Sequence, residues 1–310
     1  MLGAPISDFD QARAMRIGVC IIPTDPWPTA VAQSRRVEEL GYDHLWTYDH
    51  LSWQHYRERP WFGAIPWLTG IAGVTERIRL GTLVCSPNFR EPLTLAKDAI
   101  ALDHVSGGRF VLGVGAGGTG WDATVYGRGA LGPAARSARL AEMVEALDGL
   151  LTSDAYSFSG EHYVIDDART MPGPLQDPRL PLAVAAAGPK ALALAARFGD
   201  AWITIGDPWH DGSSAGIERA VRSQTAQLED ACATIGRDPA TLDRVFLSGA
   251  GDDRPLASLT AFEDCVGRYR GLGITDLVVH HPRAEDTHWD DPPDILEQVA
   301  AHALSDAQRA

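Results

Sequence analysis

Short apolar runs alternate along this chain with longer stretches in which apolar residues recur at helical spacing. The short runs predict strands over 16–22, 43–48, 78–84, 109–114, 182–186, 201–205, 244–247 and 275–280. The longer stretches predict helices over 29–40, 65–75, 92–105, 134–151, 189–198, 217–235, 259–272 and 293–304. Eight strand-then-helix units favour a closed (β/α)8 barrel, the α/β TIM barrel, over an open doubly wound sheet.

One segment breaks this alternation after the fourth unit. Residues 156–158 and 161–165 predict the two arms of a small hairpin, and the proline-rich stretch 171–181 predicts a loop. We therefore expect one barrel domain over residues 1–310 with a hairpin insertion at about 154–181. Residues 1–14 lack an apolar signal core, so they predict a short arm before the first strand.

The charge and the cysteines exclude several classes of partner. A net charge of −14 argues against nucleic acid and anionic membranes, because both require a basic face. No apolar run is long enough for a membrane-spanning helix. The four cysteines match no metal spacing and predict reduced thiols in a cytoplasmic protein. His280 and His281 are adjacent on one strand and point to opposite faces, so we expect no metal site there.

Two titratable residues stand at the end of the second predicted strand. Asp49 and His50 follow the apolar run directly, at the strand end where a barrel enzyme carries its chemistry. A carboxylate beside an imidazole is an arrangement suited to proton transfer. The alternative is that Asp49 caps the following turn and His50 is an ordinary surface histidine. His44, at the start of the same strand, is expected to be structural.

Small residues at two other strand ends are candidates for ligand binding. Gly113-Val114-Gly115-Ala116-Gly117-Gly118 is either a flexible loop or a backbone floor under a ring system. It is not a dinucleotide fingerprint, because it follows the fourth strand and lacks the acidic residue of that motif. Ala187-Gly188-Pro189-Lys190-Ala191 is either a plain helix start or an anion site to which Lys190 adds a charge.

Taken in order, several motifs resemble one known family. The motifs are Thr47-Tyr48-Asp49-His50-Leu51, Gly81-Thr82-Leu83-Val84-Cys85-Ser86-Pro87, Leu102-Asp103-His104-Val105-Ser106-Gly107-Gly108-Arg109-Phe110, Gly113-Val114-Gly115-Ala116-Gly117, Phe158-Ser159-Gly160-Glu161-His162-Tyr163 and Ala186-Ala187-Gly188-Pro189-Lys190. From about residue 16 to about residue 207, this ordered set is similar to the bacterial luciferase-like superfamily of flavin- and deazaflavin-dependent oxidoreductases.

The resemblance implies a (β/α)8 barrel and one of two cofactors. One branch of the superfamily binds FMN and commonly consists of monooxygenases, which need oxygen and a reductase partner. The other branch binds coenzyme F420, a deazaflavin that carries hydride and reacts poorly with oxygen. The pair Asp49-His50 resembles the F420 branch. We therefore expect F420, with FMN as the alternative.

The resemblance also implies a role for each matched residue. His50 would be the catalytic proton donor or acceptor beside the hydride-transfer carbon, and Asp49 would hydrogen-bond the ring system. Three residues would line the ring and ribityl chain: Ser86, Ala116 and Gly117. Four would hold the phosphate: Ala187, Gly188, Lys190 and Ala191. A cis peptide bond between Leu83 and Val84 would lie behind the ring.

One position departs from the family pattern. Sugar-phosphate dehydrogenases of this family have a catalytic glutamate where this chain has Gly118, and Asp122 is the nearest candidate to replace it. We therefore expect hydride transfer between F420 and a small organic substrate, as a reductase of a C=C or C=N bond. The alternatives are an FMN-dependent monooxygenase and a non-catalytic cofactor-binding barrel. We expect a homodimer.

Overall fold

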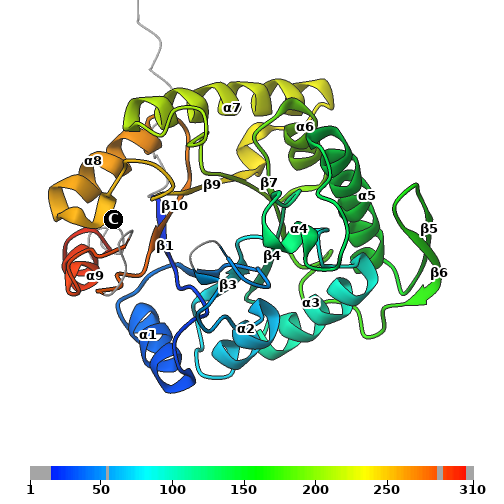
Figure 1. Cartoon of the computed structure of the whole chain (residues 1–310), viewed down its shortest axis with the longest axis horizontal. Helices are drawn as coiled ribbons and strands as arrows, with labels where there is room; N and C mark the ends of the chain where they lie inside the picture. Colours follow the sequence, from blue (N-terminus) through cyan, green and yellow to red (C-terminus); the bar gives the residue numbers. More distant parts are fainter. Residues whose placement is uncertain (1–14, 54–55, 285–288, 305–310) are drawn as a thin grey trace, which may run out of the picture.

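The computed structural model describes residues 15–53, 56–284 and 289–304. Eight parallel strands close into a barrel in the order β1-β10-β9-β8-β7-β4-β3-β2, which confirms the predicted (β/α)8 barrel (Figure 1). The barrel strands are β1 (Arg16–Cys20), β2 (His44–Thr47), β3 (Arg79–Thr82), β4 (Phe110–Val114), β7 (Leu182–Ala185), β8 (Ala201–Thr204), β9 (Asp243–Leu247) and β10 (Asp276–His280). The predicted arm at 1–14 lies outside the described residues.

Helices surround the strands as a ring (Figure 1). They are α1 (Trp27–Glu39), α2 (Ala64–Ala72), α3 (Pro92–Ser106), α4 (Trp121–Thr124), α5 (Pro133–Thr152), α6 (Pro189–Phe198), α7 (Ser214–Thr234), α8 (Leu259–Arg270) and α9 (Ile295–Val299). All but α4 correspond to predicted helices. Within the described segments, no helix is both long and apolar enough to cross a bilayer.

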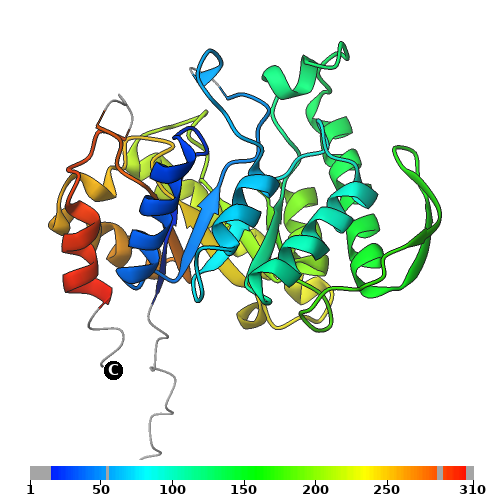
Figure 2. The ribbon, with the colours of Figure 1, turned by 90° about the horizontal axis from the view of Figure 1, so that it is seen from below.

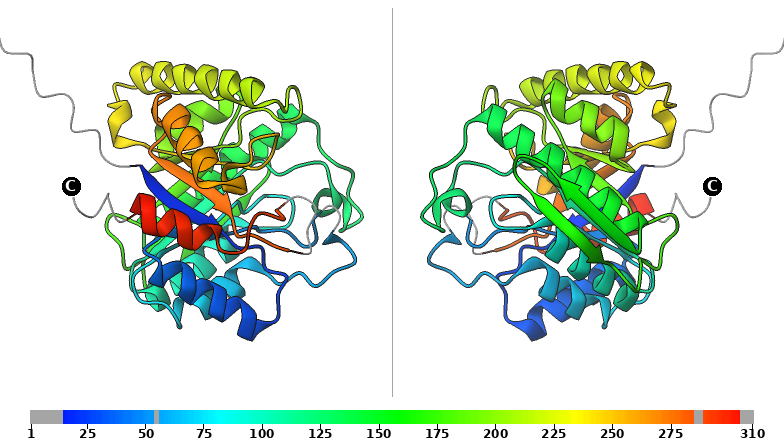
Figure 3. Two further views of the ribbon diagram at one scale, coloured as in Figure 1. Left: turned by 90° about the vertical axis from the view of Figure 1, so that its left-hand side faces the viewer. Right: turned by 90° about the vertical axis from the view of Figure 1, so that its right-hand side faces the viewer.

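A two-stranded hairpin lies outside the barrel, beyond α5 (Figure 3). Its strands are β5 (Ala155–Ser159) and β6 (Val164–Arg169), so the prediction of a second strand at 161–165 was wrong by three residues. The reason is a turn held from outside the hairpin. The Glu142 carboxylate, on α5, accepts hydrogen bonds from the backbone amides of residues 161, 162 and 163 at 2.9, 2.8 and 3.2 Å.

Polar groups close the end of the barrel where the strands begin. Asp276 accepts hydrogen bonds from Arg16 at 2.6 Å and pairs with Nε2 of His44 at 3.1 Å. Burial opposes the charge of Asp276, but the bonds with His44 and Arg16 prevail and hold the pKa of this carboxyl well below its usual range. Nδ1 of His44 accepts a hydrogen bond from the Trp46 indole at 2.6 Å. His44 is therefore structural, as predicted.

Candidate active site

The candidate residues follow four strands that are neighbours in the barrel. β2 pairs with β3, β3 with β4, and β4 with β7. Because these strands are parallel, the segments that follow them meet at one mouth of the barrel. The barrel therefore brings together residues 49–50, 83–86, 116–117 and 187–191, which are far apart in the sequence.

His50 forms a close pair with a carboxylate from another loop. Oδ2 of Asp122 lies 2.5 Å from Nδ1 of His50, and Oδ1 of the same residue accepts a hydrogen bond from the Leu51 amide at 3.0 Å. Asp122 is buried and lies on α4, which rises on the same side of the barrel as the loop after β2 (Figure 2). Because a carboxylate accepts the Nδ1 proton, Nε2 is the ring nitrogen left for chemistry.

Asp49 is buried in an ion pair directly before His50. Its side chain is 1% exposed, and its two oxygens accept hydrogen bonds from Nε and a terminal nitrogen of Arg90 at 2.9 and 2.6 Å. Burial works against the charge of Arg90, but the bonds to Asp49 prevail and raise the pKa of the guanidinium. Asp49 is not among the residues that line the adjacent cavity. The pair fixes the backbone on which His50 stands, and a contact of Asp49 with a ring stays a prediction.

A cavity of about 470 Å³ opens beside His50 at the mouth of the barrel. Leu83, Val84 and Ala187 are the other predicted site residues in its wall, and the bond between Leu83 and Val84 is cis, as predicted. The remaining wall is mostly apolar or aromatic: Tyr48, Trp53, Ala185, Ala186, Ile203, Thr204, Ile205, Gly206, Trp209, Leu247, Gly249, Ala250 and Trp289.

The glycine loop after β4 is packed against the segment after β3. A Cβ atom on Gly115 would lie 2.6 Å from Cγ2 of Val84. A Cβ atom on Gly117 would lie 2.6 Å from the Asn88 amide nitrogen and 2.7 Å from the Ser86 hydroxyl, and its φ is +72°. Only glycine allows so close an approach at that φ. The packing favours a backbone floor over a flexible loop, although Ser86, Ala116 and Gly117 do not line the cavity itself.

The segment after β7 presents a helix start without a side-chain cap. Gly188 is the N-cap residue of α6, Pro189 occupies the first turn, and no side chain caps the helix. Ala187, Gly188 and Lys190 are exposed, while Ala191 is half-buried. Uncapped amides at a helix N-terminus, with a lysine in the first turn, have the chemistry of an anion site.

Several aromatic residues of the site were missed by sequence reasoning. The Tyr48 hydroxyl forms a hydrogen bond with Nε2 of His280 at 2.7 Å. Burial lowers the pKa of His280 to about 3, so this imidazole is neutral. Trp289 stacks on His280 with ring centroids 4.1 Å apart. His280 is the last residue of β10, whereas Tyr48 and Trp289 lie outside the strands and helices, where no periodic signal places them.

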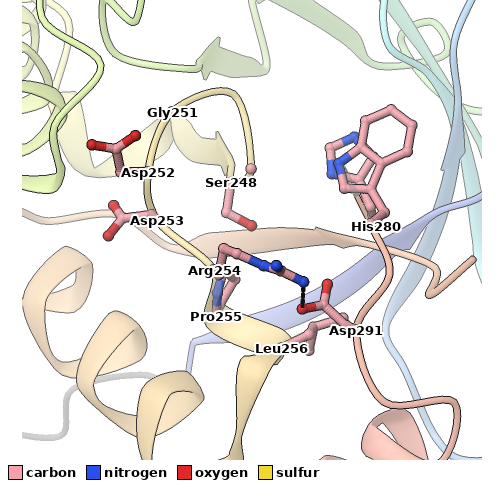
Figure 4. Close-up of a pocket in the computed structure, with 11 residues that line it drawn as sticks. Ser248, Gly251, Asp252, Asp253, Arg254, Pro255, Leu256, His280 and Asp291 are labelled. Atoms are coloured by element: carbon pink, nitrogen blue, oxygen red, sulfur yellow. Dashed lines mark hydrogen bonds and ion pairs between the residues drawn. The ribbon is translucent and has the colours of Figure 1, made fainter. Parts of the chain in front are cut away.

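A second cavity of about 320 Å³ lies beyond this wall, at the ends of β9 and β10 (Figure 4). Three of its charged side chains, Asp253, Arg254 and Asp291, are paired within the protein. Arg254 donates to Asp291 at 2.8 Å, and Asp253 accepts hydrogen bonds from Arg268 at 2.9 Å and from the Tyr269 hydroxyl at 2.7 Å. The cavity beside His50 is therefore the one whose wall includes an imidazole ready for proton transfer.

These features fit a flat ring system that carries a phosphate-bearing chain. The apolar cavity suits a ring, the glycine floor allows its close approach, and the uncapped start of α6 suits an anion. The described residues contain no group of three or more His, Cys, Asp or Glu side chains placed to hold a metal ion. The fold and the site are typical of a barrel enzyme, with a candidate organic-cofactor site at the mouth of the barrel.

Residues 10–249 match the family model of the luciferase-like monooxygenases, and the chain belongs to this family. The resemblance seen in the sequence motifs is therefore confirmed, and the protein is an oxidoreductase. This finding is against the alternative of a non-catalytic barrel.

Two curated relatives match this chain over different lengths. An F420-dependent glucose-6-phosphate dehydrogenase of Amycolatopsis mediterranei is 37% identical over 171 residues, which are 54% of this chain and 50% of that protein. A 4-hydroxyprotoasukamycin monooxygenase of Streptomyces nodosus is 34% identical over 278 residues, which are 88% of this chain and 67% of that protein. The chain thus spans half the length of the first relative and two thirds of the second.

Among solved structures, one similar chain is an F420-dependent secondary alcohol dehydrogenase in complex with an F420–acetone adduct. The TM-score is 0.77 at 17% identity, and the match covers 94% of this chain and 99% of that one. At this identity the likeness establishes the shared fold.

Proposed function

We propose that this protein transfers a hydride between coenzyme F420 and a small organic substrate, in the direction that reduces a C=C or C=N bond. The observation that carries the proposal is the pair of His50 and Asp122 at the edge of an apolar cavity. His50 follows Asp49 directly in the sequence. The names of an F420-dependent relative and an F420-dependent structural neighbour support the choice of cofactor.

The chain offers a group for each part of this cofactor. Leu83 and Val84 would support the ring, and Ser86, Ala116 and Gly117 would approach the ring and its ribityl chain. The phosphate would bind to the amides after Ala187 and Gly188, at Lys190 and Ala191, with the helix dipole and the lysine charge acting together. When bound, the reduced deazaflavin would supply the hydride.

His50 and Asp122 would manage the accompanying proton. Reduction of a double bond adds one hydride and one proton, and Nε2 of His50 would deliver that proton to the atom next to the one that accepts the hydride. Asp122 holds the imidazole in one tautomer and stabilises its protonated form by charge. Because Asp122 is hydrogen-bonded to both His50 and the Leu51 amide, its position is fixed before substrate binds.

The lining of the cavity also favours one class of substrate over another. Among the described residues that line it there is no Lys, Arg, Asp or Glu side chain. A sugar phosphate in this cavity would therefore lack a cationic partner for its phosphate. Together with Gly118 in place of a glutamate, this supports a neutral unsaturated substrate over glucose 6-phosphate.

The test is a titration of the purified apoprotein with both cofactors, followed by fluorescence quenching. We expect micromolar or tighter binding of F420 and much weaker binding of FMN. Micromolar binding of FMN with no detectable binding of F420 would refute the choice of cofactor. The reaction is tested next, with the reduced deazaflavin under anaerobic conditions and a panel of enones, imines and glucose 6-phosphate. Cofactor reduction by glucose 6-phosphate, with no oxidation by any unsaturated acceptor, would refute the reductase.

A second candidate is an FMN-dependent monooxygenase on the same barrel. The observation that favours it is the 34% identity with a monooxygenase over 88% of this chain. Such an enzyme would consume oxygen and would need a reductase partner. Oxygen uptake by the reduced, FMN-loaded protein in the presence of substrate would establish this candidate in place of the first.

Location and assembly complete the proposal. The four cysteines are buried and unpaired, which supports a reducing, cytoplasmic location. Exposed apolar side chains at Val164, Met171 and Leu175, on the hairpin and the loop after it, support a homodimer. Light scattering of the purified protein measures its mass, and a value of 33.4 kDa would exclude the dimer.

A further inference from the structure

The cavity beside His50 has an aromatic wall. Its lining includes Tyr48, Trp53, Trp209 and Trp289. Trp53 stacks on Trp289 with ring centroids 5.8 Å apart and an angle of 7° between the planes. Trp53 and Trp289 come from two separate loops, so the protein builds this stack from distant parts of its sequence.

The imidazole of His50 stacks on Trp53 of this wall. Its ring lies 6.0 Å from the Trp53 ring, with 23° between the planes. Tyr48 contacts both rings, 6.0 Å from His50 in an edge-on arrangement and 5.1 Å from Trp53. A planar ligand that stacks on this wall would therefore lie directly beside the proton-transfer group.

Trp209 stands apart from the stacked rings, at the rim of the same cavity. Its side chain is 79% exposed, and within the described part of the chain no other ring stacks on it. A ligand that covers this ring would remove its apolar area from water, which favours binding.

The loop that carries Trp209 is held firmly. The amides of His210 and Asp211 both donate to the Asp207 carbonyl at 3.2 Å. At the base of the loop, buried Gln224 donates to the Gly206 carbonyl at 3.2 Å and accepts from the Thr204 hydroxyl at 2.6 Å. Trp209 is therefore presented by an ordered turn, in a fixed position at the cavity mouth.

We infer that the substrate is a flat, uncharged molecule with an aromatic or extended conjugated ring, and that Trp209 determines this specificity. The inference rests on the proposed function for the reaction at the double bond. The aromatic wall binds one part of the molecule, and Trp209 covers its ring at the mouth. The described lining residues include no Lys or Arg to pair with a phosphate or carboxylate, which favours an uncharged ligand.

The experiment compares two probes that differ only in a ring. Benzylideneacetone and 3-penten-2-one carry the same enone, with a phenyl group in the first where the second has a methyl group. Binding to the full chain is measured by calorimetry with oxidised F420 present, so that no turnover occurs, and again without cofactor. We expect benzylideneacetone to bind at least about tenfold more tightly, which corresponds to about 1.4 kcal/mol. Equal affinities for the two probes would overturn the inference.

Variants identify the residue responsible. We expect Trp209→Ala to weaken benzylideneacetone about five- to tenfold, to leave 3-penten-2-one unchanged, and to leave the Kd for F420 within about twofold. Trp209→Phe keeps a ring and should restore most of the affinity. Tyr126→Ala removes a different exposed ring, 61% exposed and outside the cavity lining, and should change neither probe. Wild-type affinity for benzylideneacetone in Trp209→Ala would overturn the role of this residue.

The two levels of proposal fail separately. Selective binding of the aromatic probe without F420 binding would refute the proposed cofactor and leave the substrate class standing. Turnover of the aliphatic and aromatic enones at equal kcat/KM with reduced F420 would confirm the proposed reductase and overturn the substrate class.

Discussion

The Asp122 carboxylate lies 2.5 Å from Nδ1 of His50, although the two residues are 72 positions apart in the sequence. Asp122 comes from the short helix after β4, and His50 follows β2. The sequence resemblance implied a glutamate at Gly118 in the sugar-phosphate dehydrogenases, whereas the carboxylate that reaches His50 in this chain is Asp122, on α4. The result is a histidine whose orientation is set by the protein before any ligand binds.

The first prediction concerns Asp122. Asp122→Asn keeps the side-chain shape but presents an amide that can donate to Nδ1, which would favour the wrong imidazole tautomer. We expect kcat to fall about 100-fold, at the low end of the range for acid–base groups, with the Kd for F420 within about threefold. Asp252→Asn, which changes an exposed carboxylate of the second cavity, is the matched control. Unchanged kcat in Asp122→Asn would remove the pair from the mechanism.

The second prediction concerns His50 itself. His50→Ala removes the proton donor, so we expect turnover to fall by about 10²–10⁴ while the Kd for F420 stays within about tenfold. Single-turnover kinetics and cofactor titration measure the two effects separately. His104→Ala, which removes an exposed histidine from α3, should leave both unchanged. Wild-type turnover in His50→Ala would contradict the assignment.

The third prediction uses the two lysines of the chain as a matched pair. Lys190 is exposed in the first turn of α6. Lys97 lies on α3 and donates a hydrogen bond to the Met171 carbonyl. We expect Lys190→Ala to weaken F420 binding by about 1.5–3 kcal/mol, the value of a hydrogen bond to a charged group, and Lys97→Ala to have no effect. The measurement is the Kd at low and high salt. Equal Kd values for both variants at low salt would place the phosphate elsewhere.

The fourth prediction concerns stability against acid. Burial lowers the pKa of His280 from 6.5 to about 3, so between these values the unfolded chain binds a proton that the folded chain does not. The free energy of unfolding should therefore fall as the pH drops below 6.5, by about 2 kcal/mol from this residue at pH 5. His280→Gln should flatten this part of the pH profile in urea unfolding. Because partial burial lowers the pKa of His281 too, a smaller slope should remain. A profile unchanged by His280→Gln would contradict the prediction.

The barrel could be predicted from the sequence because its signals are local. Apolar runs and helical periodicity depend on neighbours within one element, and α6 begins and ends at the predicted residues, Pro189 and Phe198. The hairpin shows where such signals stop. Its second strand is displaced because Glu142, some twenty residues earlier on α5, holds the turn. No pattern within the hairpin contains that information.

The candidate site could be predicted in part. Asp49, His50 and the small residues could be proposed as site residues because they follow predicted strands, and barrel enzymes carry their active sites at the C-terminal ends of strands. Arg90 as the partner of Asp49, and Asp122 as the partner of His50, were not assigned, because both contacts join separate loops. The short helix α4 was missed since four residues cannot show a helical period.

Because Asp122 is carried by the loop between β4 and α5, and not by a strand, two properties of this enzyme are encoded separately. Leu83 and Val84, proposed to support the cofactor ring, directly follow strand β3. An insertion of one residue in that strand would disturb its pairing with the neighbouring strands. The carboxylate that pairs with His50 lies in a connecting loop, where insertions and substitutions are tolerated. On this barrel, changes in the loop after β4 can therefore move the acidic group without disturbing the residues proposed to support the ring.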